Sequence, residues 1–215
     1  MRSHSVPRLF VLPTVLIASA IGLSACGGSS DPQDANEPTG DFEVAVTKSE
    51  FPTSQRLAET SDLILGVKNT GDETVPELAF TIFTGDGEAD GSFNYRSDQP
   101  GLANPNRPIW ILENKYPREL GSPPPAGLSG GFRAQTNTFG FGPLEPGETK
   151  NIVWRVTPVK AGSYTLSYIV AAGLDGNAKA VTATGEPVKG EFVVKITDVP
   201  PKARVNDAGK VVEVG

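Results

Sequence analysis

Two stretches of the chain have residue types that could do chemistry, and the first is a serine in a glycine-rich run. Residues 127–131 read GLSGG and match the G-x-S-x-G pattern that surrounds a serine nucleophile in many hydrolases. Such a serine needs a general base, but the only histidine is His4, and prolines at 123–125 stand where a strand is required. Hydrolysis by two carboxylates stays open in principle, although no spacing singles out a pair. We therefore predict a glycine-rich loop, no catalytic residue and no enzyme activity.

The second stretch is acidic and begins at Asp86. Asp86, Glu88 and Asp90 occupy positions 1, 3 and 5 of a calcium-loop pattern, and Gly91 occupies position 6. Position 12 is Ser97 instead of glutamate, and no helical pattern flanks the loop. The pattern favours a solvated acidic turn, with calcium binding as the open alternative, and we predict no metal site and no cofactor.

The only cysteine, Cys26, follows a segment with the three parts of an export signal. Arg2 and Arg8 form a basic head, residues 9–21 form an apolar run, and small residues precede Cys26. The run of 13 residues is shorter than the roughly 20 that a membrane-spanning helix needs. The sequence therefore predicts a signal peptide over residues 1–25, cleaved between Ala25 and Cys26.

The tetrapeptide Leu23-Ser24-Ala25-Cys26 resembles the lipobox of bacterial lipoproteins. That resemblance implies that Cys26 carries a thioether-linked diacylglycerol and often a further acyl chain such as palmitate. Two or three chains hold a protein stably on a membrane. The expected location is the bacterial cell membrane, with the protein lipid-anchored and exposed outside the cytoplasm. The alternative is an ordinary secreted protein with Cys26 as a bystander, which would leave a lone thiol in an exported chain.

The segment after the expected cleavage site is polar and the remaining chain is acidic. Residues 27–40 read GGSSDPQDANEPTG, too poor in apolar residues to fold, so we predict a flexible tether over residues 26–40. Of the 19 Lys and Arg residues two lie in the signal segment, so 17 remain against 25 Asp and Glu, a formal net charge of −8. This charge disfavours nucleic acid as a partner.

Beyond the tether the apolar residues alternate with polar ones, which is the pattern of half-buried strands. About seven short strands separated by turns fit two packed antiparallel sheets. The turn at 69–72 predicts pairing of the runs before and after it, and Leu174-Asp175-Gly176-Asn177 predicts a hairpin into residues 178–184. The alternating apolar positions are Phe42, Val44, Val46, Leu63, Leu65, Val67, Leu78, Phe80, Ile82, Ile152, Trp154, Val156, Tyr164, Leu166, Tyr168, Val170, Phe192, Val194 and Ile196.

The runs LILGVKNTGDETVPELAFTI and LEPGETKNIVWRVTPVKAGSYTLSYIV resemble immunoglobulin-like modules of bacterial surface proteins, the CARDB type among them. The resemblance covers about residues 42–84 and 143–198 and implies an all-β, immunoglobulin-like antiparallel β-sandwich over residues 41–199. It also implies that Tyr164 forms a tyrosine corner, with its hydroxyl bonded to nearby backbone. An ordinary inward-facing aromatic is the alternative for Tyr164.

A long loop insertion over residues 85–139 departs from a minimal sandwich. Only residues 109–112 within it are strand-like, and their Trp110 could present a flat apolar surface to a sugar or a partner protein. The alternative is that Trp110 closes one open end of the sandwich. Residues 200–215 are expected to form a tail or an edge hairpin around residues 206–209.

These observations favour a lipid-anchored envelope lipoprotein with a non-catalytic immunoglobulin-like module. The expected partners are the membrane, reached through the N-terminal lipid, and an envelope protein or glycan at the cell surface. The alternative from a different class is a carbohydrate- or small-molecule-capture lipoprotein assisted by calcium, which needs a concave pocket.

Overall fold

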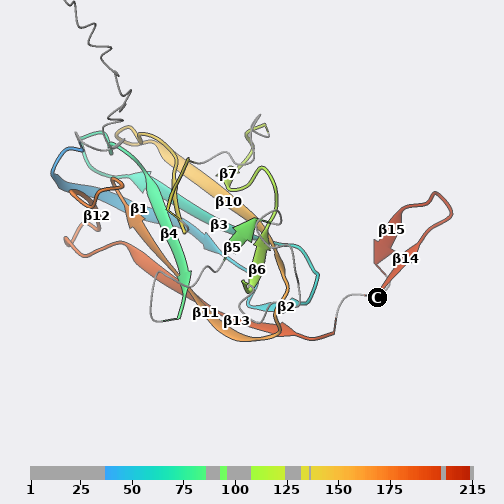
Figure 1. The fold of residues 1–215 in the computed structure, drawn as a ribbon. Coiled ribbons are helices and arrows are strands. Elements are labelled where there is room, and N and C mark those ends of the chain that lie inside the picture. Colours follow the sequence, from blue (N-terminus) through green and yellow to red (C-terminus); the bar gives the residue numbers. More distant parts are fainter. Residues whose placement is uncertain are drawn as a thin grey trace, which may run out of the picture. The chain divides into compact units, whose positions relative to one another are not determined.

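The computed structural model describes residues 37–85, 93–95, 108–123, 132–135, 137–199 and 202–213 (Figure 1). All of these residues belong to one compact unit, and every regular element within them is a β-strand. In these ranges no helix is long and apolar enough to cross a membrane. The expected all-β class is confirmed. Residues 1–36, with the predicted signal peptide, Ala25 and Cys26, lie outside the described residues.

The first sheet has seven strands, and its long members are β1 (Gly40–Glu50), β3 (Ser61–Asn69) and β10 (Thr149–Pro158). They are paired antiparallel in the order β1-β3-β10. β12 (Ala178–Val181) extends the sheet in parallel beside β1. β6 (Trp110–Leu112), β5 (Phe93–Tyr95) and β7 (Arg118–Glu119) complete it on the β10 side.

The second sheet has six strands in the order β2-β13-β11-β4-β9-β8. Its central strands are β13 (Lys189–Thr197), β11 (Gly162–Ala171) and β4 (Ala79–Thr84), and all are antiparallel. β2 (Ser54–Arg56), β9 (Thr138–Gly140) and β8 (Phe132–Gln135) are short additions. A separate hairpin of β14 (Ala203–Val205) and β15 (Val211–Glu213) turns at residues 206–209, as the sequence predicted.

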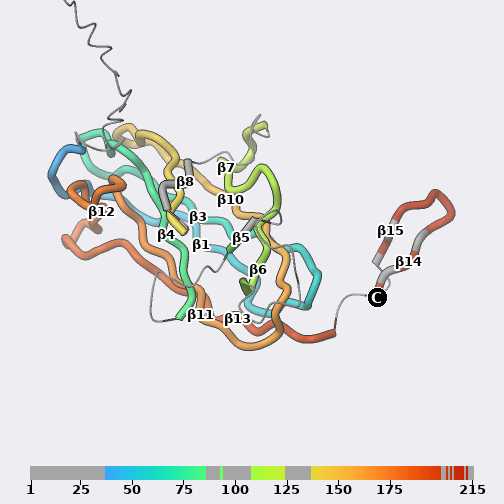
Figure 2. Tube along the Cα trace, viewed as in Figure 1, coloured from blue at the N-terminus to red at the C-terminus, as the bar shows by residue number. Residues whose placement is uncertain are grey.

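The order of the strands identifies the sandwich as immunoglobulin-like. Along the chain β1 and β3 lie in the first sheet, β4 in the second, β10 in the first, and β11 and β13 in the second, as Figure 2 traces. This matches the immunoglobulin arrangement of an ABED sheet on a CFG sheet, with β6 in the place of strand D beside β10. The predicted immunoglobulin-like fold class is therefore confirmed.

The inner faces of the two sheets form one hydrophobic core. Leu63, Leu65 and Val67 of β3 and Ile152, Trp154 and Val156 of β10 are buried, as the alternation predicted. Each such side chain contributes about 1.5–3 kcal/mol by leaving water. Phe80, Ile82, Leu166, Tyr168, Val170, Val194 and Ile196 bury the facing side from the second sheet. Three expected inward positions are exceptions: Val46 is exposed where β1 changes register between Val46 and Lys48, and Tyr164 and Phe192 are only partly buried.

Two predicted pairings are wrong, and both errors concern a turn that crosses between the sheets. β3 and β4 belong to different sheets, because the buried Asn69 side chain donates to the carbonyls of Glu73 (2.8 Å) and Leu144 (2.9 Å) and turns the chain across. Likewise, residues 174–177 are not a hairpin turn, because β12 pairs with β1 and not with β11.

The insertion 85–139 is more structured than expected in its described parts. β6 confirms the predicted strand, and β5, β7, β8 and β9 add four that the sequence did not indicate. They are only two to four residues long: β7 and β9 pair with the longer strands β10 and β4, and β5 and β8 pair with the short strands β6 and β9. The sandwich also begins before the expected boundary at residue 41, because Gly40 already pairs with Ala178.

Candidate functional site

An open depression of about 910 Å³ lies at one end of the sandwich. Residues from three segments, 52–54, 59–62 and 113–116, line it together with Arg155. This is the end at which β1 stops and β3 begins, and we name it the distal end; the opposite end, where β1 and β12 begin side by side, is the proximal end. In Figure 1, β12 and the blue start of β1 mark the proximal end, and β2 lies toward the distal end.

The floor of the depression holds a bidentate ion pair between two adjacent strands. Asp62 of β3 and Arg155 of β10 are register partners, and the Arg155 Nε and Nη2 atoms donate to the two Asp62 carboxylate oxygens, both at 2.8 Å. The hydrogen bond that Arg155 donates to Asp62 is the largest cause that raises the pKa of Arg155 further above its ordinary value. Both side chains remain partly exposed, so the pair offers fixed donors and acceptors to solvent.

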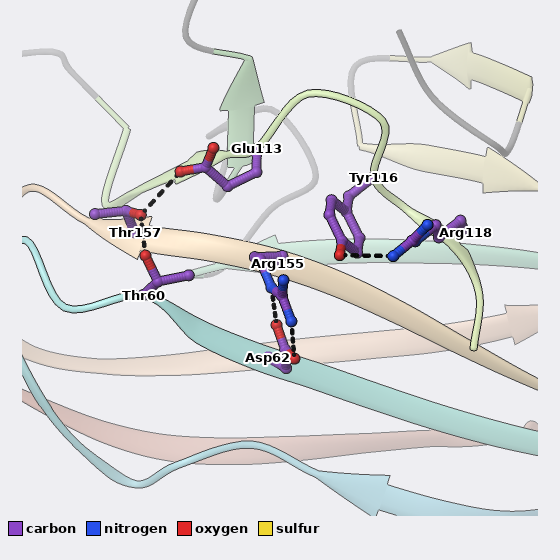
Figure 3. Close-up of polar contacts among 7 residues, drawn as sticks. All are labelled: Thr60, Asp62, Glu113, Tyr116, Arg118, Arg155 and Thr157. Atoms are coloured by element: carbon purple, nitrogen blue, oxygen red, sulfur yellow. Dashed lines mark hydrogen bonds and ion pairs between the residues drawn. The ribbon is translucent and has the colours of Figure 1, made fainter. Parts of the chain in front are cut away.

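A row of hydrogen-bonded side-chain oxygen atoms lies along one side of the depression and forms its wall (Figure 3). Thr157 Oγ1 lies 3.2 Å from Thr60 Oγ1 and donates to Glu113 Oε1, also at 3.2 Å. Glu113 follows β6, so its carboxylate belongs to the insertion, whereas the two threonines flank the ends of β3 and β10. The wall therefore joins the insertion to the sandwich through side-chain hydrogen bonds.

Tyr116 connects two guanidinium groups beside the ion pair. Arg118 Nη2 donates to Tyr116 Oη at 3.0 Å, and the Arg118 guanidinium carbon lies 4.7 Å from the ring centre. The Arg155 guanidinium carbon lies 5.2 Å from the same centre. Each contact is a cation–π interaction that fixes the direction of an arginine. Because the ring itself is buried, Tyr116 supports the site and does not offer a stacking surface.

The loops on both sides of the depression contain non-glycine residues with left-handed backbone conformations. Ala58 has a φ of 62° and Lys115 a φ of 71°, and they are the two such residues within the described ranges. The Ala58 amide donates to the carbonyl of Pro158 at 3.0 Å, so strand ends hold the turn in place. Residues other than glycine adopt this region at a cost, and such residues concentrate at functional sites.

The charged groups of the depression already have partners among neighbouring side chains. The three carboxylates that line the depression are engaged: Asp62 with Arg155, Glu59 with Arg56 at 3.0 Å, and Glu113 with Thr157. Within the described ranges, no group of three or more His, Cys, Asp and Glu side chains could hold a metal ion. Charged groups, hydroxyls and the Asn114 amide together offer many hydrogen bonds to a polar ligand.

Trp110 does not present a surface, and this expectation is corrected. Its side chain is 0% exposed and is packed against the rings of Phe51, Phe93 and Tyr164 at 5.7–6.0 Å. Its Nε1 donates to Gln55 Oε1 at 2.8 Å, so the indole is satisfied inside the core. The alternative interpretation, in which Trp110 closes an end of the sandwich, agrees with this burial.

Tyr164 forms the hydrogen bond expected of a tyrosine corner. Its hydroxyl donates to the carbonyl of Ala161 at 2.9 Å, which confirms the backbone bond that the resemblance implied.

The acidic stretch with Asp86, Glu88, Asp90 and Ser97, and the glycine-rich residues 127–131, lie outside the described residues.

Sequence reasoning missed every residue of the depression. Asp62 and Arg155 occupy outward positions of their strands, where a polar residue is ordinary. Only the register of β3 against β10 brings the two together. The only local signal was that Arg155 lies between two buried residues. This pattern indicates that its side chain points outward, but it does not indicate a partner.

Comparisons with known proteins find distant structural likenesses only. No protein-family model matches the chain, and a search of curated proteins found no relative. Among solved structures, it is similar to the CARDB domain of a Pyrococcus furiosus protein in complex with di-metal ions (14% identity, 75% of this chain, 99% of that chain, TM-score 0.41). It is also similar to a cohesin module from a Clostridium perfringens family 33 glycoside hydrolase (12% identity, 73% and 98%, TM-score 0.39).

A further match is a β-glucosidase from Listeria innocua (13% identity), in which 74% of this chain corresponds to 17% of that chain at a TM-score of 0.33. At such identities and TM-scores the likenesses carry no argument about binding or chemistry. The immunoglobulin-like fold rests on the strand order of the chain itself.

Proposed function

We propose that this protein is a lipid-anchored, non-catalytic immunoglobulin-like module that uses the distal depression to contact a protein or glycan of the bacterial cell envelope. One observation carries the proposal: the depression and the point where the chain joins the sandwich lie at opposite ends of β1. β1 has 11 residues, which at a rise of roughly 3.3 Å per residue separate the two ends by about 33 Å. A module attached at its proximal end exposes its distal end to partners.

The proposed anchor is the lipid on Cys26, the residue that follows the lipobox-like Leu23-Ser24-Ala25. Residues 27–36 then separate the lipid from the sandwich. The module would be exposed outside the cytoplasm on the cell membrane, where a polar, acidic surface remains soluble. The proposal of a non-catalytic role is supported by the engagement of Asp62, Glu59 and Glu113 in ion pairs and hydrogen bonds.

The depression itself favours a second candidate, the capture of a carbohydrate or another polar small molecule. Its volume of about 910 Å³ is in the range of ligand sites, and its lining is rich in hydroxyl, carboxylate and amide groups. In this case the occupant would be a free ligand and not the surface of a partner protein.

Two experiments test the proposal. Mass spectrometry of the N-terminal peptide from isolated membranes is expected to find Cys26 modified by diacylglycerol, and Cys26→Ser is expected to release the protein into the culture fluid. An unmodified Cys26 on mature protein from culture fluid would reject the anchor.

A photo-crosslinking amino acid at Asn114 in the depression is expected to yield a specific adduct in intact cells. The same amino acid at Lys179, an exposed residue of β12 at the proximal end, is the matched control. Equal adducts from both positions would argue against contact through the depression. A rise in melting temperature with a glycan, without protein adducts, would favour the capture candidate.

A further inference from the structure

A single carboxylate fastens the N-terminal end of the sandwich. Glu37 lies against the turn between β11 and β12, where its Oε2 accepts hydrogen bonds from the amides of Leu174 (2.7 Å) and Asp175 (2.8 Å). Its Oε1 accepts another from the amide of Ala178 at 2.7 Å. Three backbone donors that converge on one carboxylate form an anion-binding nest, here filled by the chain itself.

The turn is shaped to receive this carboxylate. A Cβ atom added to Gly173 would lie 2.2 Å from the Glu37 carboxyl carbon, so no other residue fits there while the contact is made. Three residues later in the chain, the Gly40 amide donates to the carbonyl of Asn177 at 3.2 Å, and Gly40 is the register partner of Ala178. Residues 37–40 are therefore held at both ends against the same turn.

The electrostatics of this contact favour the ionised carboxylate. Partial burial acts to raise the pKa of Glu37, but the backbone hydrogen bonds outweigh it and hold the pKa below its usual value. Hydrogen bonds to an ionised acceptor are about twice as strong as neutral ones. The other charged residues near this contact are Asp41 and Glu43 of β1, Asp175 of the turn and Lys179 of β12.

We propose that Glu37 is the positioning residue that fixes where the chain enters the sandwich. Residues 37–40 therefore belong to the sandwich, which corrects the expected tether over residues 26–40 at its C-terminal end. Release of Glu37 would detach residues 37–39 from the turn and lengthen the segment that precedes the sandwich by about 10 Å at full extension.

The test is hydrogen exchange of the protein from Cys26 to Gly215, and the measurement does not require the lipid. In Glu37→Ala, exchange of the peptide over residues 173–178 is expected to accelerate at least about tenfold, while peptides of β11 and β13 stay protected. Glu43→Gln is the matched control, because Glu43 is a glutamate of β1 whose carboxylate accepts from the Thr70 hydroxyl at 2.8 Å and makes no contact with the turn amides. Unchanged exchange over 173–178 in Glu37→Ala would overturn the proposal.

If Glu37→Ala weakens the whole fold, Glu37→Gln keeps the measurement decisive, since its amide oxygen can accept fewer of the three bonds and its side chain keeps the same size. A local acceleration confined to 173–178 in Glu37→Gln supports the proposal. Acceleration spread evenly over β11 and β13 in both variants would mean that Glu37 only stabilises the fold, which overturns the positioning role.

Discussion

Substitution of Trp110 tests whether this residue belongs to the core or to a binding surface. Trp110 and Gln55 are almost fully buried and are bonded through Nε1 and Oε1 at 2.8 Å, while Gln55 Nε2 donates to the carbonyl of Pro52 at 2.9 Å. Trp110→Phe removes the donor and leaves the buried Gln55 oxygen without its partner. A surface aromatic, in contrast, could be replaced with a change in stability within about 0.5 kcal/mol.

The magnitude follows from two contributions. An unsatisfied buried acceptor costs about 1–3 kcal/mol, and the volume lost from the indole adds about 1 kcal/mol of packing. Trp110→Phe is thus expected to lower the free energy of unfolding by about 2–4 kcal/mol. Trp154→Phe is the matched control: Trp154 is equally buried, but its Nε1 has no hydrogen-bond partner among the described residues. Its replacement loses packing alone and is expected to cost about 1–2 kcal/mol less than Trp110→Phe.

The assay is urea unfolding of the four proteins of a double-mutant cycle: wild type, Trp110→Phe, Gln55→Met and the double variant. Because the double variant removes donor and acceptor together, its loss is expected to fall short of the sum of the single losses by about 1–2 kcal/mol. Strictly additive losses, or a Trp110→Phe variant as stable as the wild type, would refute the assignment of Trp110 to a hydrogen-bonded core.

Three further outcomes are expected. Ala58→Gly should raise the free energy of unfolding by about 0.5 kcal/mol, because glycine adopts a φ of 62° without strain. Ala45→Gly in the extended β1 should instead lower the free energy of unfolding by about 1 kcal/mol, and changes of the same sign in urea unfolding would contradict the reasoning. Gly66→Ala should cost about 1–3 kcal/mol in the same assay, since its Cβ would lie 2.8 Å from the Cβ of Lys48 on the neighbouring strand β1, and a neutral effect would contradict the packing. Because the pKa of Glu37 is lowered in the folded protein, its contribution to stability should be present above the ordinary glutamate pKa of about 4.3 and should be lost as the pH falls through the folded pKa. Hydrogen exchange over 173–178, corrected for intrinsic rates, should then accelerate only in acid, and an acceleration that begins above pH about 4.3 would contradict a lowered pKa.

The strands were predictable because alternation is a local property of the sequence. Leu63, Leu65 and Val67 mark one face of β3 whatever that strand pairs with. The pairing was not predictable from turns, because a turn does not state whether the chain returns to the same sheet. The decisive contact for the turn at 69–72 is the bond from Asn69 to Leu144, which is 75 positions away in the chain. Short strands such as β7 have no alternation at all and exist through their pairing with β10.

The candidate site was hidden for the same reason. Asp62 and Arg155 are 93 positions apart, and only the β3–β10 register makes them partners. Glu37 was placed in a flexible tether because its neighbours are polar, and composition cannot reveal that backbone amides of the turn at 173–178 donate hydrogen bonds to its carboxylate. Patterns within one strand are legible in the sequence, and contacts that depend on two distant segments are not.

The described part of the insertion couples the core to the depression, which decides how function must be tested. Residues 110–112 place Trp110 in the core, and the same segment continues within a few residues to Glu113 and Asn114 in the wall of the depression. A substitution at Trp110 therefore alters stability and site together, and loss of binding in such a variant would not identify a binding residue. Asn114 is exposed, so a change there that abolishes an adduct while leaving the urea midpoint unchanged reports on contact alone.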